Sequence, residues 1–155
     1  MQKRWRELWG LNDALPPDCT ECRNPDGGGL VGLGDFLIRK HPRFAVGLVS
    51  STQDGIIRLF YSSGNNDCKD FETADMVSSF LGAGGGMFSG ETFQSGLEDL
   101  RARFLTPPRN AAYFLSGGRH QHLWRPRFFE APSGGMTIAR WLTDFLQGQG
   151  HNLGP

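Results

Sequence analysis

The sequence lacks the features that would assign it to a membrane-bound or nucleic-acid-binding class of protein. No apolar run approaches the ~20 residues that a membrane-spanning helix needs. Lys plus Arg number 16, as do Asp plus Glu, so no basic field is present to bind nucleic acid. Residues 1–6 are basic, but no apolar segment follows them, so they are not a signal peptide. We therefore expect neither a membrane nor a nucleic acid as a partner.

Cysteine is scarce and odd in number. Cys19 and Cys22 form a C-x-x-C, and Cys68 stands alone. Without a second C-x-x-C or a nearby pair of histidines, zinc is a weak interpretation, and we predict neither a metal nor a cofactor. Pro16-Pro17 places the pair in a loop, which disfavours a thioredoxin-type redox site. We favour a solvent-side Cys19–Cys22 disulfide over two free thiols.

A nucleophile motif of the serine-hydrolase type is also missing. The chain has no Gly-x-Ser-x-Gly sequence, and Ser89-Gly90 lacks the glycine two residues before the serine. The run 84–86 is three glycines, but it lacks the Gly-Lys-Ser/Thr ending of a phosphate-binding loop. We interpret that run as a loop that lines a substrate entrance.

What is present alternates between helical and strand patterns, so the predicted fold class is α/β. Apolar residues recur every three or four positions over 2–9, 30–41, 71–81, 92–104 and 137–147, which predicts helices. Two continuous apolar runs, 44–50 and 110–116, are typical of strands buried on both faces of a parallel sheet. Because helical sequence joins these runs, we predict that they are parallel neighbours. Residues 56–61 fit either period, and the tail from Gly148 is expected to be loose.

Each predicted strand ends in a polar loop with an ionisable side chain. Asp54 follows the first strand, and His120 and His122 follow the second. Catalytic groups of open α/β sheets collect at the carboxyl ends of the strands. An acid followed by a histidine is also the chain order of a serine-esterase triad, in which the acid orients the imidazole and the imidazole moves the proton. We predict Asp54 as the acid and His120 as the histidine, with His122 as the alternative.

Both side chains also have a purely structural interpretation. Asp54-Gly55 is a common turn dipeptide, and an Asp after a strand often caps the next helix. A histidine in a glycine-rich loop is more often solvated than catalytic, and we interpret His41 and His151 as surface residues. Distance separates the two interpretations. A carboxylate within roughly 2.6–3.2 Å of an imidazole nitrogen supports catalysis.

A resemblance to a known family adds to the esterase interpretation. Six segments carry it in order along the chain: Leu15-Pro16-Pro17-Asp18-Cys19-x-x-Cys22, Val49-Ser50-Ser51-Thr52-Gln53-Asp54, Phe60-Tyr61, Gly96-Leu97, Gly117-x-x-His120 with Leu123, and Trp141-Leu142. With these segments, residues 9–141 resemble the C-terminal part of the pectin acetylesterase-like family, relatives of the plant pectin acetylesterases and of the animal carboxylesterase Notum. The resemblance implies a secreted or periplasmic α/β-hydrolase that acts on an acylated carbohydrate or similar ester. It places the acid at Asp54 and the histidine at His120.

The chain departs from that family at the nucleophile. The family's serine elbow and its oxyanion-hole glycines lie upstream of the matching region, so we expect 1–155 to be a single, incomplete α/β-hydrolase domain, the C-terminal part of the sheet with its flanking helices. An incomplete sheet would expose an edge for self-association.

Two other functions compete with the esterase interpretation. A non-catalytic binding module would use the aromatic and glycine-rich loops, and a phosphoesterase accessory domain would need a histidine after residues 84–86, which the sequence does not have.

Overall fold

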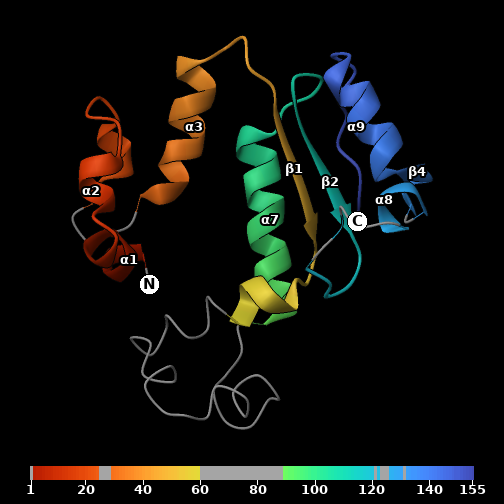
Figure 1. The fold of residues 1–155 in the computed structure, drawn as a ribbon, viewed down its shortest axis with the longest axis horizontal. Coiled ribbons are helices and arrows are strands. Elements are labelled where there is room, and N and C mark those ends of the chain that lie inside the picture. The colour runs from red at the N-terminus through yellow and green to blue at the C-terminus, as the bar shows by residue number, and fades with distance from the viewer. Residues whose placement is uncertain (1, 25–28, 60–88, 121, 123–125, 131) are drawn as a thin grey trace, which may run out of the picture.

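The computed structural model describes residues 2–24, 29–59, 89–120, 122, 126–130 and 132–155 (Figure 1). The elements in chain order are α1 (Gln2–Leu8), α2 (Leu11–Ala14), the 3-10 helix η1 (Thr20–Cys22), α3 (Leu30–Lys40), β1 (Val46–Ser51), α7 (Gly90–Phe104), β2 (Asn110–Leu115), α8 (Arg127–Glu130), β3 (Pro132–Ser133), β4 (Met136–Thr137) and α9 (Ile138–Leu146). A further helix begins at Gly55 and is described to Leu59. Four predicted helices are confirmed to within two residues, and the predicted helix 71–81 lies outside the described residues. None of the helices in the described ranges is long and apolar enough to cross a membrane.

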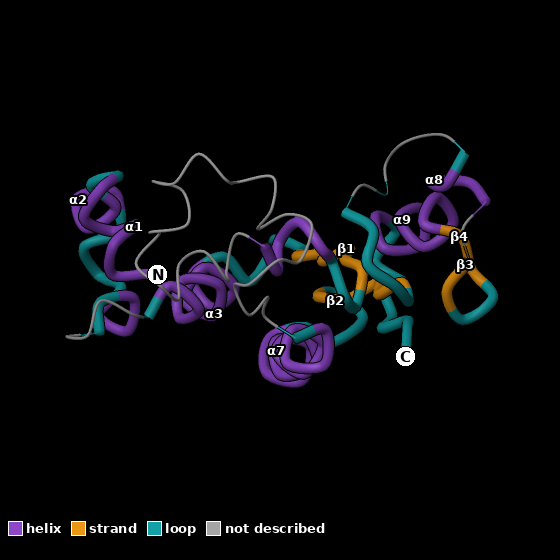
Figure 2. The backbone as a smooth tube through the Cα atoms, turned by 90° about the horizontal axis from the view of Figure 1, so that it is seen from below, coloured by secondary structure: helices purple, strands orange, loops and turns teal. Residues whose placement is uncertain are grey.

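Strands β1 and β2 form a parallel pair, from Val46 opposite Asn110 to Ser51 opposite Leu115. The predicted parallel pairing is therefore confirmed. Figure 2 shows α7 on one side of the two strands and α9 on the other. The described part of the chain is thus a mixed α/β arrangement, with a small parallel sheet between helices.

The two faces of β2 bury different side chains. Alternate side chains of a strand point to opposite faces. Two hydrophobic clusters follow that alternation: Ala111, Tyr113 and Leu115 pack with Ile138, Trp141 and Phe145 of α9, and Ala112 and Phe114 pack with Leu97 and Leu105. A Cβ at Gly47 of β1 would lie 3.2 Å from the rings of both Trp141 and Phe145, so glycine there lets α9 approach the sheet closely.

β1 is less buried than predicted. Every residue of β2 is buried, whereas Val46 and Gly47 of β1 are exposed and the next three residues are half-buried. The prediction of burial on both faces is therefore right for β2 and wrong for β1. The physical reason is position, because β1 pairs with β2 alone among the described residues, whereas β2 has β1 on one edge and Leu153 on the other.

The C-terminal tail is not loose, and that prediction is wrong. Leu153 lies beside β2, where its amide donates to the Ala112 carbonyl and its carbonyl accepts from the Phe114 amide, both at 2.9 Å. The Asn152 side chain adds two contacts, since Oδ1 accepts from the Ala112 amide at 2.8 Å and Nδ2 donates to the Leu105 carbonyl at 3.0 Å. The tail therefore acts as a further strand-like segment, and it explains why β2 is buried along its whole length.

A third apolar cluster joins the segment after α2 to α3. Cys19 and Cys22 are joined by a disulfide, as predicted, and pack with Leu15 and Phe36. Both cysteines are fully buried, so the prediction of a solvent-side disulfide is wrong. The cause is α3, which packs on η1 and covers the two sulfurs. Cys68 lies outside the described residues.

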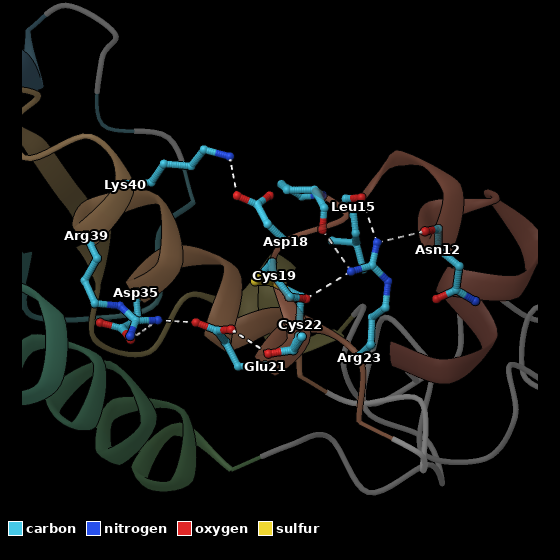
Figure 3. Close-up of a disulfide and its surroundings, with 12 residues drawn as sticks. Asn12, Leu15, Asp18, Cys19, Glu21, Cys22, Arg23, Asp35, Arg39 and Lys40 are labelled. Atoms are coloured by element: carbon cyan, nitrogen blue, oxygen red, sulfur yellow. Dashed lines mark hydrogen bonds and ion pairs between the residues drawn. A yellow bond between two sulfur atoms is a disulfide. The ribbon is translucent and has the colours of Figure 1, made fainter.

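A single guanidinium organises the loop around this disulfide (Figure 3). The Arg23 side chain donates to four backbone carbonyls at 2.8–3.3 Å: those of Asn12, Leu15, Pro16 and Cys19. Ion pairs connect the same loop to α3, from Lys40 to Asp18 at 2.7 Å and from Arg39 to Glu21. The N-terminal unit, meaning residues 2–24 together with α3, is therefore held by the hydrogen bonds of Arg23 to backbone carbonyls, by the ion pairs, by the buried disulfide and by its small apolar core.

Candidate functional site

The loops that follow β1 and β2 are joined at the carboxyl end of the sheet. Three amides of the first loop donate to carbonyls at the end of β2 or in the second loop at 2.8–3.0 Å: Thr52 to Leu115, Gln53 to Gly117 and Gly55 to Gly118. Glycine permits this approach, because Gly117 has φ +100° and a Cβ at Gly118 would lie 3.2 Å from the Gln53 carbonyl oxygen. The predicted site residues are carried by these two joined loops.

Asp54 and His120 are in contact. Nδ1 of His120 lies 2.9 Å from Oδ2 and 3.1 Å from Oδ1 of Asp54. The Asp54 side chain is 5% exposed, whereas that of His120 is 41% exposed. An ionised carboxylate can only accept, so Nδ1 carries a proton, and in the neutral ring Nε2 then keeps its lone pair. The predicted distance is confirmed, and the catalytic role of the pair stays a prediction.

Asp54 also caps a helix, as its structural interpretation predicts. Oδ1 accepts hydrogen bonds from the amides of Ile56 at 3.0 Å and Ile57 at 2.9 Å, in the first turn of the helix that begins at Gly55. The two interpretations are therefore compatible. The helix start fixes the carboxylate, and the fixed carboxylate receives His120.

His122 occupies a different environment from His120. Its Nε2 lies 2.8 Å from Oγ of Ser51 and 3.1 Å from the Arg119 carbonyl oxygen. Burial lowers the pKa of His122 below its ordinary value of 6.5, against smaller opposing effects of the Arg119 carbonyl and the Asp54 charge. His122 is therefore not the partner of Asp54, and the alternative assignment does not match the geometry.

The described residues bring no hydroxyl to His120, whose hydrogen bonds go to Asp54 alone. Ser89, which lacks the first glycine of a Gly-x-Ser-x-Gly motif, caps α7 instead. Its Oγ accepts from the Thr92 amide at 3.0 Å. Of the other histidines, His41 is exposed, as predicted, and His151 is half-buried. Sequence reasoning also missed Ser51, whose burial follows only from its place opposite Leu115 in the sheet.

Two of the hollows in the described structure differ in their relation to the predicted site. One, of about 710 Å³, opens at the carboxyl ends of β1 and β2 and is lined in part by Ser51, Arg119 and His122. The other, of about 630 Å³, lies between α3 and α7 and includes Phe93 and Leu97 but none of the predicted site residues. No group of three or more His, Cys, Asp or Glu that could hold a metal occurs within the described ranges.

No protein-family model matches the chain, and neither a search of the curated proteins nor one of the solved structures found a match. The family resemblance therefore stays a prediction, and function has to be argued from the site.

Proposed function

We propose that this chain supplies the acid and the histidine of a carboxyl-ester hydrolase. The observation that supports the proposal is the 2.9 Å contact between Asp54 and His120 at the carboxyl end of two parallel strands. The acid is buried and held by two backbone amides, while the imidazole is accessible to a reacting group. This combination suits an orienting acid and a proton-transferring base.

In the proposed reaction His120 acts as general base and then as general acid. Nε2 accepts the proton of an attacking hydroxyl as its oxygen bonds to the acyl carbon, and returns that proton to the alkoxide as the ester C–O bond breaks. Water then attacks the acyl group in the same way, which releases the acid and restores the hydroxyl. Asp54 holds the ring and stabilises its charged form. The nucleophilic hydroxyl comes from a part of the enzyme outside the described residues.

The substrate in this proposal is the O-acyl group of a carbohydrate or a similar ester, as the family resemblance implies. The parent protein is secreted or periplasmic, and the chain forms the C-terminal part of an α/β-hydrolase sheet. The parallel pair between helices is consistent with such a sheet. The Cys19–Cys22 disulfide suits an oxidising compartment.

The test supplies the missing nucleophile from solution. Purified chain is mixed with 4-nitrophenyl acetate and an added alcohol, and transfer of the acetyl group to the alcohol is measured. We expect wild type to accelerate the transfer several-fold, and His120→Ala and Asp54→Asn to lose that acceleration. His41→Ala is the matched control, because His41 is exposed and stacks on Phe44 away from the pair.

Two outcomes would contradict the proposal in different ways. Equal rates in wild type and in the site variants would remove Asp54 and His120 from catalysis and favour the non-catalytic binding module. Rapid hydrolysis of simple acetyl esters without added alcohol, lost in both variants, would show that the chain carries its own nucleophile. Otherwise we expect hydrolysis by the chain alone to stay barely above background, since triad members act as a unit.

A further inference from the structure

The loop after β2 carries two histidines with opposite surroundings. His120 lies on Asp54 and its side chain is 41% exposed, whereas His122, two residues later, is 7% exposed. A strongly polar ring is costly to bury unless its nitrogens are bonded. The burial of His122 therefore calls for a structural or functional reason.

Ser51 provides the contact that holds His122 in place. It is the last residue of β1, is 1% exposed, and comes three residues before Asp54. Its Oγ lies 2.8 Å from Nε2 of His122. This side-chain bond joins the end of β1 to the loop just beyond His120.

The protonation of His122 follows from its second contact. The Arg119 carbonyl oxygen, 3.1 Å from Nε2, can only accept, so Nε2 carries the proton. A single N–H is thus shared between that carbonyl and Oγ of Ser51. His122 acts as a hydrogen-bond donor in this arrangement and has no lone pair directed at Ser51 with which to activate it.

The chain is hydrogen-bonded on both sides of His120. On its N-terminal side, the Gly118 carbonyl accepts from the Gly55 amide at 2.8 Å. On its C-terminal side, His122 is bound to Ser51 and to the carbonyl of Arg119, the residue before His120. Both attachments lead back to the segment that carries Asp54, so they set the position of His120 relative to that acid.

We propose that His122 is a positioning residue whose bond to Ser51 holds the His120 ring on Asp54. The inference rests on the proposed function in one respect, that an oriented His120 is useful as a base. The lowered pKa of His122 agrees with it, because burial favours the neutral ring, in which the proton is on Nε2 and Nδ1, buried without a hydrogen-bond partner among the described residues, carries none. Replacing the donor should free the loop and let the His120 ring turn away.

Nuclear magnetic resonance of the full chain tests the proposal directly. The ring nitrogen shifts of His120, measured at a pH where the ring is neutral, report which nitrogen carries the proton. We expect wild type to show the Nδ1–H form that Asp54 selects. We expect His122→Leu and Ser51→Ala to show a mixture of both tautomers, because the ring is no longer held.

Two conservative variants separate positioning from general destabilisation. His122→Gln keeps N–H donors near the place of Nε2, and Ser51→Thr keeps a hydroxyl, so both should restore the Nδ1–H form of His120. Unchanged indole signals of Trp141, the α9 residue that is buried against β2, confirm that each variant is folded. A folded His122→Leu chain that keeps the pure Nδ1–H form would overturn the proposal.

The same spectra distinguish failure of this inference from failure of the proposed function. Asp54→Ala, which removes the acceptor, must abolish the preference for the Nδ1–H form if the pair exists in solution. If that variant and His122→Leu both lose it while acyl transfer is independent of His120, positioning stands and the esterase proposal fails. If the pair is present and His122→Leu leaves it intact, the esterase proposal stands and the positioning role fails.

Discussion

Trp141 donates its indole Nε1–H to the backbone carbonyl of His151 at 2.7 Å. This bond attaches α9 to the tail that runs beside β2. Trp141→Phe keeps an aromatic ring but leaves the carbonyl without this donor, so we expect the free energy of unfolding to fall by about 1–3 kcal/mol. Urea denaturation measures the change. Leu146→Ala on the same helix is the control, because Leu146 is 75% exposed and should change stability by less than about 0.5 kcal/mol.

Replacing Arg23 should loosen the N-terminal unit. A lysine keeps the charge but cannot reach four carbonyls with a planar fork, so Arg23→Lys is expected to cost about 1–3 kcal/mol. Hydrogen exchange of the amides of residues 12–23 is the local readout. Arg39→Lys, in an exposed ion pair with Glu21, should cost less than about 1 kcal/mol. Equal effects of the two substitutions would argue against a special role for Arg23.

Thiol titration tests the disulfide. The chain contains three cysteines, and the Cys19–Cys22 bond leaves one thiol, that of Cys68. In denaturant we expect one reactive thiol per chain without reductant and three with it, provided that the protein is made under oxidising conditions. Three thiols before reduction would refute the disulfide. Because the bond closes a loop of about four residues, its reduction should cost only about 2 kcal/mol of stability.

The burial of His122 predicts a pH dependence of stability. Its folded-state pKa is lowered from 6.5, so the unfolded chain binds the proton more tightly. The stability that the neutral ring contributes is then complete above pH 6.5 and is lost as the pH falls from there toward the lower folded value. Denaturation between pH 8 and pH 5 should therefore show wild type losing stability relative to His122→Gln. An exposed substitution, His41→Gln, should leave the wild-type slope unchanged, and a slope shared by wild type and His122→Gln would contradict the prediction.

The open edge of β1 predicts self-association. Val46 is exposed there, and the strand pairs with β2 alone among the described residues. Unpaired edge groups are a template for another strand. We expect light scattering to show dimers or larger species at raised concentration and Val46→Lys to shift them toward monomer. Leu146→Lys, on the exposed side of α9, should not do so, and equal effects of both lysines would indicate non-specific association.

The sequence was informative where periodicity or topology decides the structure. The three- and four-residue spacing of Ile138, Trp141 and Phe145 located α9, and the helical sequence between the two apolar runs required a crossover and hence parallel strands. Because Asp54 and His120 each follow the carboxyl end of one of these parallel strands, both are predicted at one edge of the sheet, where they are found in contact.

Predictions from sequence patterns are wrong where contacts with another segment of the chain decide the structure. The apolar runs of β1 and β2 look alike, yet within the described ranges only β2 has a partner on each edge. The sequence predicts a loose tail from Gly148, and that tail contains three glycines. They instead permit close packing, since a Cβ at Gly150 would lie 2.3 Å from the Pro108 oxygen and one at Gly154 would lie 2.6 Å from Phe114. Ser51 likewise looks like any loop serine until the strand register is known.

The carboxylate of Asp54 serves the first turn of a helix and the ring of His120 at the same time. The winding of this first helical turn and the orientation of the His120 ring are therefore linked equilibria, and each favours the other. A ligand that favours the oriented ring must also favour the wound helix. It should then slow the solvent exchange of the Ile56 and Ile57 amides, although it touches neither. Occupancy of the site would thus be visible in two backbone protons on a neighbouring helix, before any product is formed.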